Sequence, residues 1–269
     1  MVYQPTYREH APSPDLAQHV SCYWTARHEA SPRLHDVPLT DRVFPDACMD
    51  LLFDLSAGTA MLVGTMTRPL AISKSGPMDF LGVRFRPAGI GAVLSLPACE
   101  VTDTAIPVDV VWGARARHLV NGLQEASTTA ARLSVIETDI RRRMSGGPGG
   151  DTLAHRAAGL VERARGSVSV QSLSDATGLG TRQLERRFLA AVGLAPKTAC
   201  RVVRFQTALR HMHGRPGVAL SRVALECGYH DQPHFTRDFR MFAHESPRAY
   251  RRRSGLDVAF VQDGALRAG

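Results

Sequence analysis

Two helix-turn-helix patterns about fifty residues apart, within residues 168–253, constrain this chain more than any other feature. The first has Leu173 and Gly178 before its turn, and the second has Val223 and Gly228 in the equivalent places. Aligning Gly178 with Gly228 also aligns the apolar residues that follow, provided that the second copy has one extra residue after its turn. The pattern predicts two units joined by a helical segment, an arrangement that can enter two successive major grooves of DNA.

Net charge differs between the two halves of the chain. Residues 151–269 contain 19 Lys and Arg against 10 Asp and Glu, whereas residues 1–150 contain 14 against 15. The halves therefore carry +9 and −1, which sum to the net charge of +8. A positive excess confined to the C-terminal part favours a polyanion binder there, with a merely solubilising basic face as the alternative.

Cysteine usage and hydropathy argue against several protein classes. The five cysteines are odd in number and widely spaced, and none forms a CxxC pair, which argues against a disulfide framework and a structural zinc site. Met1 is not followed by a basic and long apolar segment, and no apolar run approaches the 18 or so residues of a membrane span. We expect a cytoplasmic chain with no catalytic site, cofactor, metal or membrane partner.

The segment Ser145-Gly146-Gly147-Pro148-Gly149-Gly150 marks the clearest boundary, because four glycines and a proline favour a flexible linker. The expected organisation has four parts: residues 1–144 as a sensory or dimerisation domain, residues 145–152 as a linker, residues 153–253 as the double helix-turn-helix domain, and residues 254–269 as a tail. The fold class is α+β, with a β-rich N-terminal domain that carries helices and an all-α C-terminal domain.

Short apolar runs bounded by turn residues predict strands in the N-terminal part, in a small sheet or barrel. These runs are residues 49–55, 60–64 and 79–85. Helices are predicted over residues 87–96, 114–125 and 128–144. The last two helices either pack on the N-terminal domain or form a dimer seam, and we favour the first arrangement.

In the first helix-turn-helix unit, Leu184 and Phe188 have the spacing of a buried helix face, and Thr181 is the expected N-cap. The opposite face carries the residues expected to contact DNA: Arg182, Gln183 and Arg186, with Arg187 reaching a phosphate. Arg pairs bidentately with guanine and Gln with adenine, so this helix can read base edges. The alternative is an ordinary solvated basic face.

A connecting helix is predicted over residues 198–213, and the second unit follows it. There Phe235, Phe239 and Phe242 are expected in the core, and Pro233 fits the first turn of the reading helix. The DNA-facing residues are expected to be Gln232, His234, Thr236 and Arg237, with Arg240 and the run Arg251-Arg252-Arg253 on phosphates. For His234, a base edge, a phosphate and plain packing all remain open.

Residues 153–253 resemble the AraC/XylS family of bacterial transcription regulators. The motifs that carry the resemblance are Leu173-x-x-Ala176-x-Gly178, Leu184-x-Arg186-x-Phe188, Gly193-Leu194-x-Pro196, Val223-Ala224, Cys227-Gly228-Tyr229, Phe235-x-Arg237-x-Phe239 and Ser246-Pro247-x-x-Tyr250-Arg251. The resemblance implies binding to double-stranded DNA near promoters, usually with activation of transcription and RNA polymerase as a partner. Two departures concern the second unit: Ala243-His244-Glu245 replaces the family's aromatic-Gly pattern, and Pro233 replaces a small polar residue.

The N-terminal half resembles an uncharacterised domain, DUF6597, found in some AraC-type regulators. The residues that suggest it are Tyr23-Trp24, Phe44-Pro45-Asp46-Ala47-Cys48-Met49-Asp50-Leu51 and Gly82-Val83-Arg84-Phe85-Arg86-Pro87-Ala88-Gly89. In the wider family this place holds a sensory domain, often a cupin-like barrel. A small-molecule effector and a homodimer are therefore expected partners.

Arg84 and Arg86 lie two apart on a predicted strand and therefore point the same way. Together with Asp46 they form a candidate ligand site, in which the two arginines hold a carboxylate or phosphate. The alternative, which we favour at this stage, is that they pair with Asp46, Asp50 or Asp54 and close the domain.

Two other function classes remain as alternatives. A DNA-binding enzyme with a metal-bound, methyl-accepting cysteine would need cysteines at close metal-ligand spacings, and the chain has no GxSxG, P-loop or HExxH motif either. A sequence-neutral architectural binder fits the charge, but it would make two separately equipped reading helices superfluous.

Overall fold

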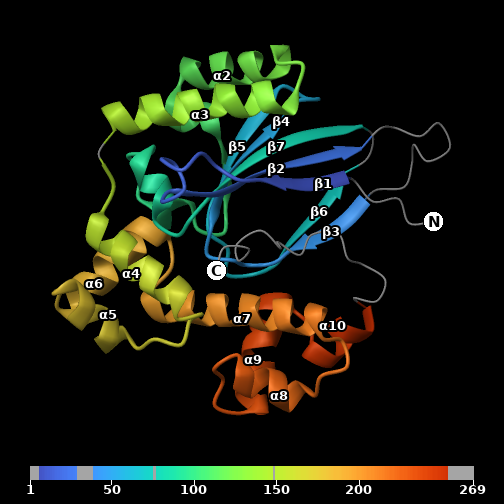
Figure 1. The fold of residues 1–269 in the computed structure, drawn as a ribbon, viewed down its shortest axis with the longest axis vertical. Coiled ribbons are helices and arrows are strands. Elements are labelled where there is room, and N and C mark those ends of the chain that lie inside the picture. The colour runs from blue at the N-terminus through green and yellow to red at the C-terminus, as the bar shows by residue number, and fades with distance from the viewer. Residues whose placement is uncertain (1–5, 29–38, 75–76, 148, 254–269) are drawn as a thin grey trace.

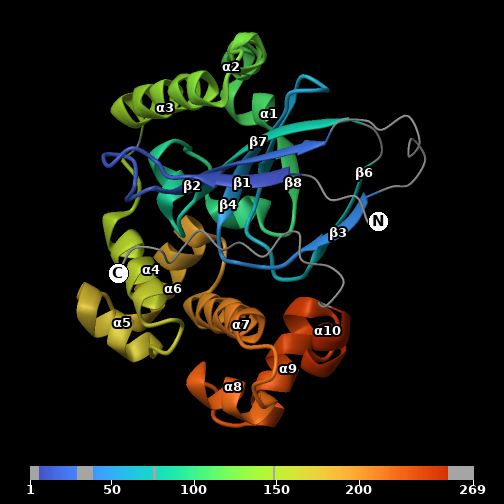
Figure 2. The same ribbon diagram turned by 45° about the vertical axis from the view of Figure 1, so that its right-hand side comes forward.

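The structure is a computed structural model, and it describes residues 6–28, 39–74, 77–147 and 149–253. Figures 1 and 2 show helices at the top, antiparallel sheets in the middle, and the helices of the C-terminal region at the bottom. The predicted α+β fold class is therefore confirmed. The predicted tail, residues 254–269, lies outside the described residues.

The N-terminal region contains a six-stranded antiparallel sheet in the order β1-β2-β7-β4-β5-β8 and a two-stranded ribbon, β3-β6. The strand bounds are β1 Thr6–His10, β2 Val20–His28, β3 Leu39–Val43, β4 Met49–Asp54, β5 Thr59–Val63, β6 Leu70–Lys74, β7 Met78–Phe85 and β8 Ala105–Pro107. The three strands predicted from apolar runs correspond to β4, β5 and β7. The cupin-like barrel stays a prediction.

Strand β4 shows why these residues form a sheet with one buried face. Met49, Leu51 and Phe53 are buried and alternate with less buried neighbours, as the period of a strand requires. Its neighbour β7 needs glycine at position 82, because a Cβ there would lie 1.9 Å from the Trp24 ring. The Trp24 indole thus lies across the sheet, and its Nε1 donates to Asp50 Oδ1 at 2.8 Å.

Short helical segments follow the sheet: the 3₁₀ turns η1 (Gly89–Ala92) and η2 (Ala98–Val101) and the helix α1 (Val108–Trp112). Only η1 forms where a helix was predicted over residues 87–96. Ala88 adopts a left-handed conformation at φ 67°, so the chain turns there and a regular α-helix cannot run through it. That helix prediction was therefore wrong in length and type.

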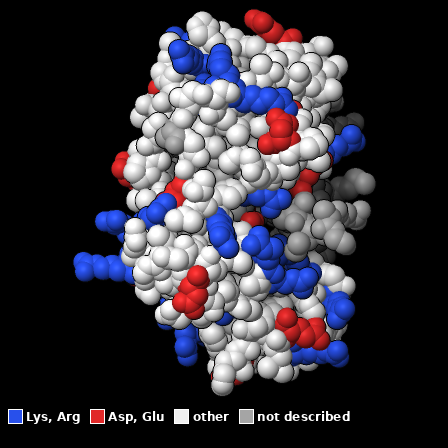
Figure 3. Space-filling model, turned by 60° about the vertical axis from the view of Figure 1, so that its left-hand side comes forward, with Lys and Arg blue, Asp and Glu red and all other residues white. Residues whose placement is uncertain are grey.

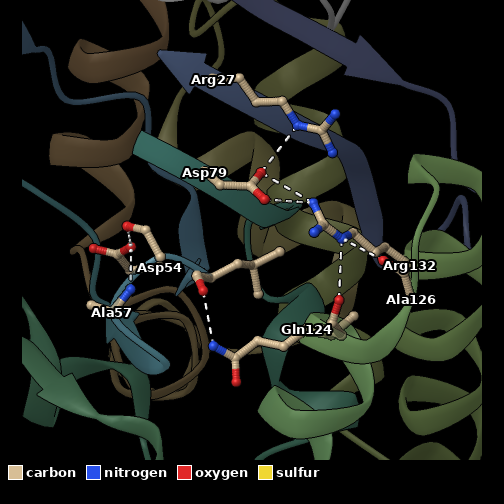
Figure 4. A network of polar contacts seen from close by, with 10 residues as sticks. Arg27, Asp54, Ala57, Asp79, Gln124, Ala126 and Arg132 are labelled. Carbon is tan, nitrogen blue, oxygen red and sulfur yellow. Dashed lines mark hydrogen bonds and ion pairs between the residues drawn. The ribbon is translucent and has the colours of Figure 1, made fainter. Parts of the chain in front are cut away.

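Helices α2 (Ala114–Glu125) and α3 (Thr129–Gly146) cover the sheet. Figure 4 shows the polar contacts that attach them: Arg132 binds both carboxylate oxygens of Asp79 at 3.1 and 2.9 Å, and Gln124 donates to the Leu55 carbonyl at 2.9 Å. Leu123, Ile136 and Ile140 join the same apolar core as the strands. The expectation that these helices pack on the N-terminal domain is confirmed, and α3 extends two residues into the segment expected to be a linker.

The described part of the C-terminal region consists of helices joined by turns and short loops. Its elements are α4 (Thr152–Arg163), α5 (Val170–Thr177), α6 (Thr181–Val192), α7 (Pro196–Gly214), α8 (Leu220–Glu226), α9 (Gln232–Ala243) and α10 (Pro247–Arg253). Pro196 begins the connecting helix, where its missing N–H leaves no hydrogen bond unmade. Helix α7 lies between the two helix-turn-helix units, as Figure 1 shows, and one continuous apolar core joins residues of α4 to α10.

Candidate nucleic-acid interface

The first helix-turn-helix unit consists of α5 and α6. The Ser169 hydroxyl caps α5 by accepting from the Ser172 amide at 3.0 Å, and Gly178 ends it in the left-handed conformation at φ 69°. In α6, Leu184 and Phe188 are fully buried. The residues predicted to contact DNA, Arg182, Gln183 and Arg186, are all exposed. The sequence pattern thus separates a core face from a solvent face on this helix.

The start of α6 differs from the prediction. Gly180 is the N-cap, in an extended conformation, and no side chain caps the helix. Thr181 is already the first helical residue, so its assignment as the N-cap was wrong. Because Gly180 has no side chain, it leaves the N-terminal end of α6 unobstructed, and this is the end of a reading helix that enters a groove.

Arg187, predicted to reach a phosphate, has a protein partner. Its Nε and Nη2 lie 2.6 and 2.7 Å from the two carboxylate oxygens of Asp151, and the Arg187 guanidinium lowers the pKa of that carboxyl. Asp151 also caps α4, because its Oδ1 accepts from the Leu153 and Ala154 amides. Arg187 therefore fastens the first reading helix to α4, and its phosphate contact stays a prediction.

The second unit consists of α8 and α9. Asp231 caps α9 by accepting from the His234 amide at 2.7 Å, and Pro233 lies in the first turn, as predicted. Phe235, Phe239 and Phe242 are fully buried, which confirms the predicted core face. The opposite face forms a surface hollow of about 420 Å³ whose lining includes four of the residues predicted to contact DNA: Gln232, Thr236, Arg237 and Arg240.

Beneath this face lies a buried ion pair that the sequence reading missed. Asp238 of α9 has 2% of its side chain exposed, and Arg201 of α7 donates to its Oδ1 from Nε at 3.1 Å and Nη2 at 2.8 Å. Asp238 lies on the buried face of α9, whose other members are mostly aromatic, and the spacing of apolar residues along the sequence does not reveal a buried carboxylate there. The pair holds α9 in position on the connecting helix.

His234 is half-buried beside this pair. Its ring meets the Tyr229 ring edge-on with centroids 5.2 Å apart, and its Nε2 lies 3.8 Å from Asp238 Oδ2. Packing is thus present in the structure. A contact of His234 with a base edge or phosphate stays a prediction.

The three arginines at the end of α10 have different environments. Arg252 is exposed, whereas Arg253 donates to Glu245 at 2.7 Å. Nε and Nη2 of Arg251 are buried within the protein. Arg252 and the exposed Arg240 are therefore better placed for phosphates than Arg251 or Arg253. Figure 3 shows many Lys and Arg side chains on the half of the molecule formed by these helices, and fewer acidic ones.

The N-terminal candidate cluster is partly brought together. Arg84 Nε lies 3.5 Å from Asp46 Oδ2 and 3.4 Å from Asp50 Oδ1, and Arg84 and Asp46 are both more than nine-tenths buried at their side chains. Burial raises the pKa of Asp46 even though the Arg84 guanidinium opposes this. The expected pairing that closes the domain is thus present for Arg84. Asp54 does not join it and instead accepts from Ser56 and the Ala57 amide.

Arg86 follows the end of β7 and faces another part of the molecule. Its Nε donates to the Ala17 carbonyl at 2.9 Å, and its Nη1 lies 3.7 Å from Glu162 Oε1 of α4. Arg84, Arg86 and Asp46 nevertheless line one cavity together. The sequence placed these three residues near one another, but it gave no sign that C-terminal helices complete the cavity.

Contacts between the two regions were not predicted. Thr102 donates to the carbonyl of Gly193, the residue that ends α6, at 2.7 Å. Gln206 of α7 donates to the Pro45 carbonyl at 2.7 Å. Phe44 packs edge-on against Phe205 of α7 at 5.9 Å. The N-terminal region therefore touches both the first reading helix and the connecting helix.

Two further observations concern other kinds of site. Across the described residues, no group of three or more His, Cys, Asp or Glu side chains is arranged to hold a metal ion. None of the described helices combines the length and apolar character needed to span a bilayer.

Comparisons with known proteins cover both regions. The HTH-type transcriptional regulator VirS of Mycobacterium tuberculosis is 33% identical over 111 residues, which are 40% of this chain and 32% of that protein. The HTH-type transcriptional regulator MtrA of Neisseria gonorrhoeae is 26% identical over 140 residues, which are 51% of this chain and 46% of that protein. The chain thus matches less than half the length of these relatives.

Two solved structures are also similar. A transcriptional regulator with an AraC-type DNA-binding domain from Chromobacterium violaceum is 24% identical with a TM-score of 0.36, covering 39% of this chain and 95% of that one. ToxT from Vibrio cholerae is 10% identical with a TM-score of 0.44, covering 92% and 97%.

Family models assign the two regions separately. Residues 173–253 match a family described as a helix-turn-helix domain, and residues 8–107 match a domain of unknown function, DUF6597. The first range contains both units built around α6 and α9. Residues 173–253 are therefore similar to the helix-turn-helix family, and residues 8–107 are similar to the DUF6597 family.

Proposed function

We propose that this chain is a sequence-specific, DNA-binding regulator of transcription that acts in the cytoplasm. One observation carries the proposal: each of two helix-turn-helix units buries one face of its second helix and exposes Arg and Gln side chains on the other. Arg and Gln are the residue types that distinguish guanine and adenine in the major groove. Helices α6 and α9 are the two readers, and α7 holds them in a fixed relation.

Roles within the interface follow from exposure. Base contacts fall to the exposed residues at the N-terminal ends of the readers: Arg182, Gln183 and Arg186 in α6, and Gln232 and Arg237 in α9, with His234 and Thr236 beside them. Arg240 and Arg252 are proposed as phosphate contacts. Phosphate contacts orient the protein on the duplex, whereas base contacts give specificity.

Regulation through the N-terminal region is a second part of the proposal. The contacts of Thr102 with Gly193 and of Gln206 with Pro45 support it, because a change in the N-terminal region reaches both α6 and α7 directly. Activation through contact with RNA polymerase and assembly into a homodimer complete the proposed mode of action. The similarity of residues 173–253 to the helix-turn-helix family supports a regulator over the enzyme alternative.

The testing experiment is selection of bound sites from random duplex DNA by the full-length protein, repeated over a series of salt concentrations. We expect an enriched asymmetric site with two blocks about one helical turn apart. Arg186→Ala and Arg237→Ala should each weaken binding to that site by about 1–3 kcal/mol and relax preference at one block. Arg117→Ala, at an exposed arginine of α2, is the matched control and should change nothing.

A contrasting variant tests the phosphate contacts. Arg252→Ala should weaken binding to selected and random DNA alike. It should also reduce the slope of the logarithm of the binding constant against the logarithm of the salt concentration by about one, as expected for one lost phosphate contact. Equal affinity of the unmodified protein for every duplex would instead favour the architectural alternative and contradict the proposal.

A further inference from the structure

A cavity of about 530 Å³ between the sheet and the C-terminal helices has no role in the proposed DNA contacts. One wall comes from the N-terminal region and includes Cys22, Asp46, Arg84 and Arg86. The other wall comes from α4, the residues that follow it, and α7. A volume of this size is typical of a small-molecule site, and its position makes both regions contribute to any occupant.

The charges around the cavity are unequal. Six arginines line it against three carboxylates; the arginines are Arg84, Arg86, Arg156, Arg163, Arg165 and Arg210. The carboxylates are Glu9, Asp46 and Glu162. Burial raises the pKa values of Asp46 and Glu162, whereas the neighbouring Arg84 and Arg86 guanidinium groups oppose this. The cavity thus favours a negatively charged occupant.

The lining of the cavity includes both polar and apolar groups. Arg84 already faces two carboxylates, because its Nε lies 3.5 Å from Asp46 Oδ2 and 3.4 Å from Asp50 Oδ1. We therefore do not expect Arg84 to be the main contact of an occupant. The Arg86 side chain is one-third exposed, and within its guanidinium only Nε is hydrogen bonded to a described residue, through the Ala17 carbonyl. Its Nη1 lies 3.7 Å from Glu162, beyond hydrogen-bond distance. Apolar lining comes from residues that include Cys22, Pro87 and Val203.

We propose that this cavity binds a small organic anion with an apolar body, whose charged group contacts the Arg86 guanidinium in place of Glu162. An anion at Arg86 gains the charge-assisted hydrogen bonds that Glu162 does not make at its distance. The displaced Glu162 lies on α4, the helix that Asp151 and Arg187 fasten to the first reader. Displacing Glu162 would change the contact of α4 with the sheet, and the effect of that change on the first reader rests on the proposed function. Binding of the anion itself does not.

The test uses 8-anilinonaphthalene-1-sulfonate, an aromatic anion whose fluorescence rises in apolar surroundings, and its uncharged analogue N-phenyl-1-naphthylamine. Both are titrated into the full-length protein without DNA, so the outcome is independent of whether the chain reads a DNA sequence. We expect saturable binding of the sulfonate at one site and at least tenfold weaker binding of the uncharged analogue. Equal binding of the two probes would overturn the anionic character of the site.

Two variants test the role of charge. Arg86→Met should weaken sulfonate binding about tenfold and leave the uncharged probe unchanged, because it removes the charged partner and keeps an apolar side chain. Glu162→Gln should strengthen sulfonate binding severalfold, because it removes the competing carboxylate. This variant tests the contact with Arg86 even if Arg86→Met fails to fold. Arg117→Met is the matched control. Unchanged sulfonate binding in Arg86→Met or Glu162→Gln would overturn the contact.

A third variant tests the location. Gly159 of α4 lines the cavity, and a Cβ there would approach only the flexible end of Arg163, at 3.1 Å from Nη1. Gly159→Leu should therefore fill the cavity and abolish binding of both probes, while leucine favours the helix more than glycine does. Gly214→Leu, in open space at the end of α7, is the matched control. Unchanged binding in Gly159→Leu would overturn the cavity as the site.

Discussion

The buried pair Arg201–Asp238 offers the sharpest test of how the second reader is held. Asp238 keeps 2% of its side chain in solvent and Arg201 keeps 24%, and Arg201 donates two hydrogen bonds to the buried carboxylate. Removing one partner of a buried pair costs about 3–5 kcal/mol, because the other charge stays buried without compensation. We expect Arg201→Met to cost about 3 kcal/mol, at the lower end of that range, since water reaches part of Arg201.

The assay is urea unfolding of the full-length protein followed by far-ultraviolet circular dichroism, with hydrogen exchange of the α9 amides as a local measurement. The double variant Arg201→Met/Asp238→Leu should recover most of the loss, because an apolar pair leaves no buried charge. Arg222→Met breaks the exposed pair of Arg222 with Glu226, and it should produce no resolvable change. A loss below about 1 kcal/mol in Arg201→Met, or a double variant no more stable than the single one, would refute the reasoning.

Three further predictions concern other contacts. Phe44→Ala should cost about 3 kcal/mol and speed proteolysis between the two regions, because Phe44 is 9% exposed and packs on Phe205 and Tyr250; equal cleavage rates would contradict this. Asp151→Asn keeps the α4 cap but loses the pair with Arg187. Because the folded pKa of Asp151 is lowered, the stability difference from the unmodified protein should be full above about pH 4 and vanish as pH falls further, and a pH-independent difference would argue against the pair. Gly193→Ala should destabilise more than Gly178→Ala in thermal unfolding: both have positive φ, but only at Gly193 would a Cβ meet Thr65 Oγ1, at 2.2 Å.

The features predicted correctly from the sequence are those that local chemistry decides. Gly178 marks a helix end and Pro233 a helix start for steric reasons that act within a few residues, and the buried phenylalanines of α9 follow from helical spacing. The exposure of Arg182, Gln183 and Arg186 followed from the same periodicity. Thr181 failed as a cap because Gly180 can end the turn without any side-chain bond, a choice that propensity does not reveal.

Features that depend on distant segments could not be predicted in this way. The hydrogen bond from Thr102 to Gly193 joins residues 91 positions apart, and that from Gln206 to the Pro45 carbonyl joins residues 161 apart. Neither a threonine nor a glutamine carries any local sign of such a partner. The same holds for Glu162, whose place opposite Arg86 depends on how α4 docks against the sheet.

The shared core around α7 has a consequence for the DNA that such a protein accepts. Residues of both units pack into one apolar cluster with α7, so a shift of one reader relative to the other would open the interior. Inserting one base pair between two recognition blocks rotates the second block by about 34–36° and moves it about 3.4 Å along the duplex axis. A rigid pair of readers cannot follow that rotation. The protein would therefore accept only a narrow range of spacings between the two blocks. Its sites would be defined by that spacing as much as by the sequence of each block.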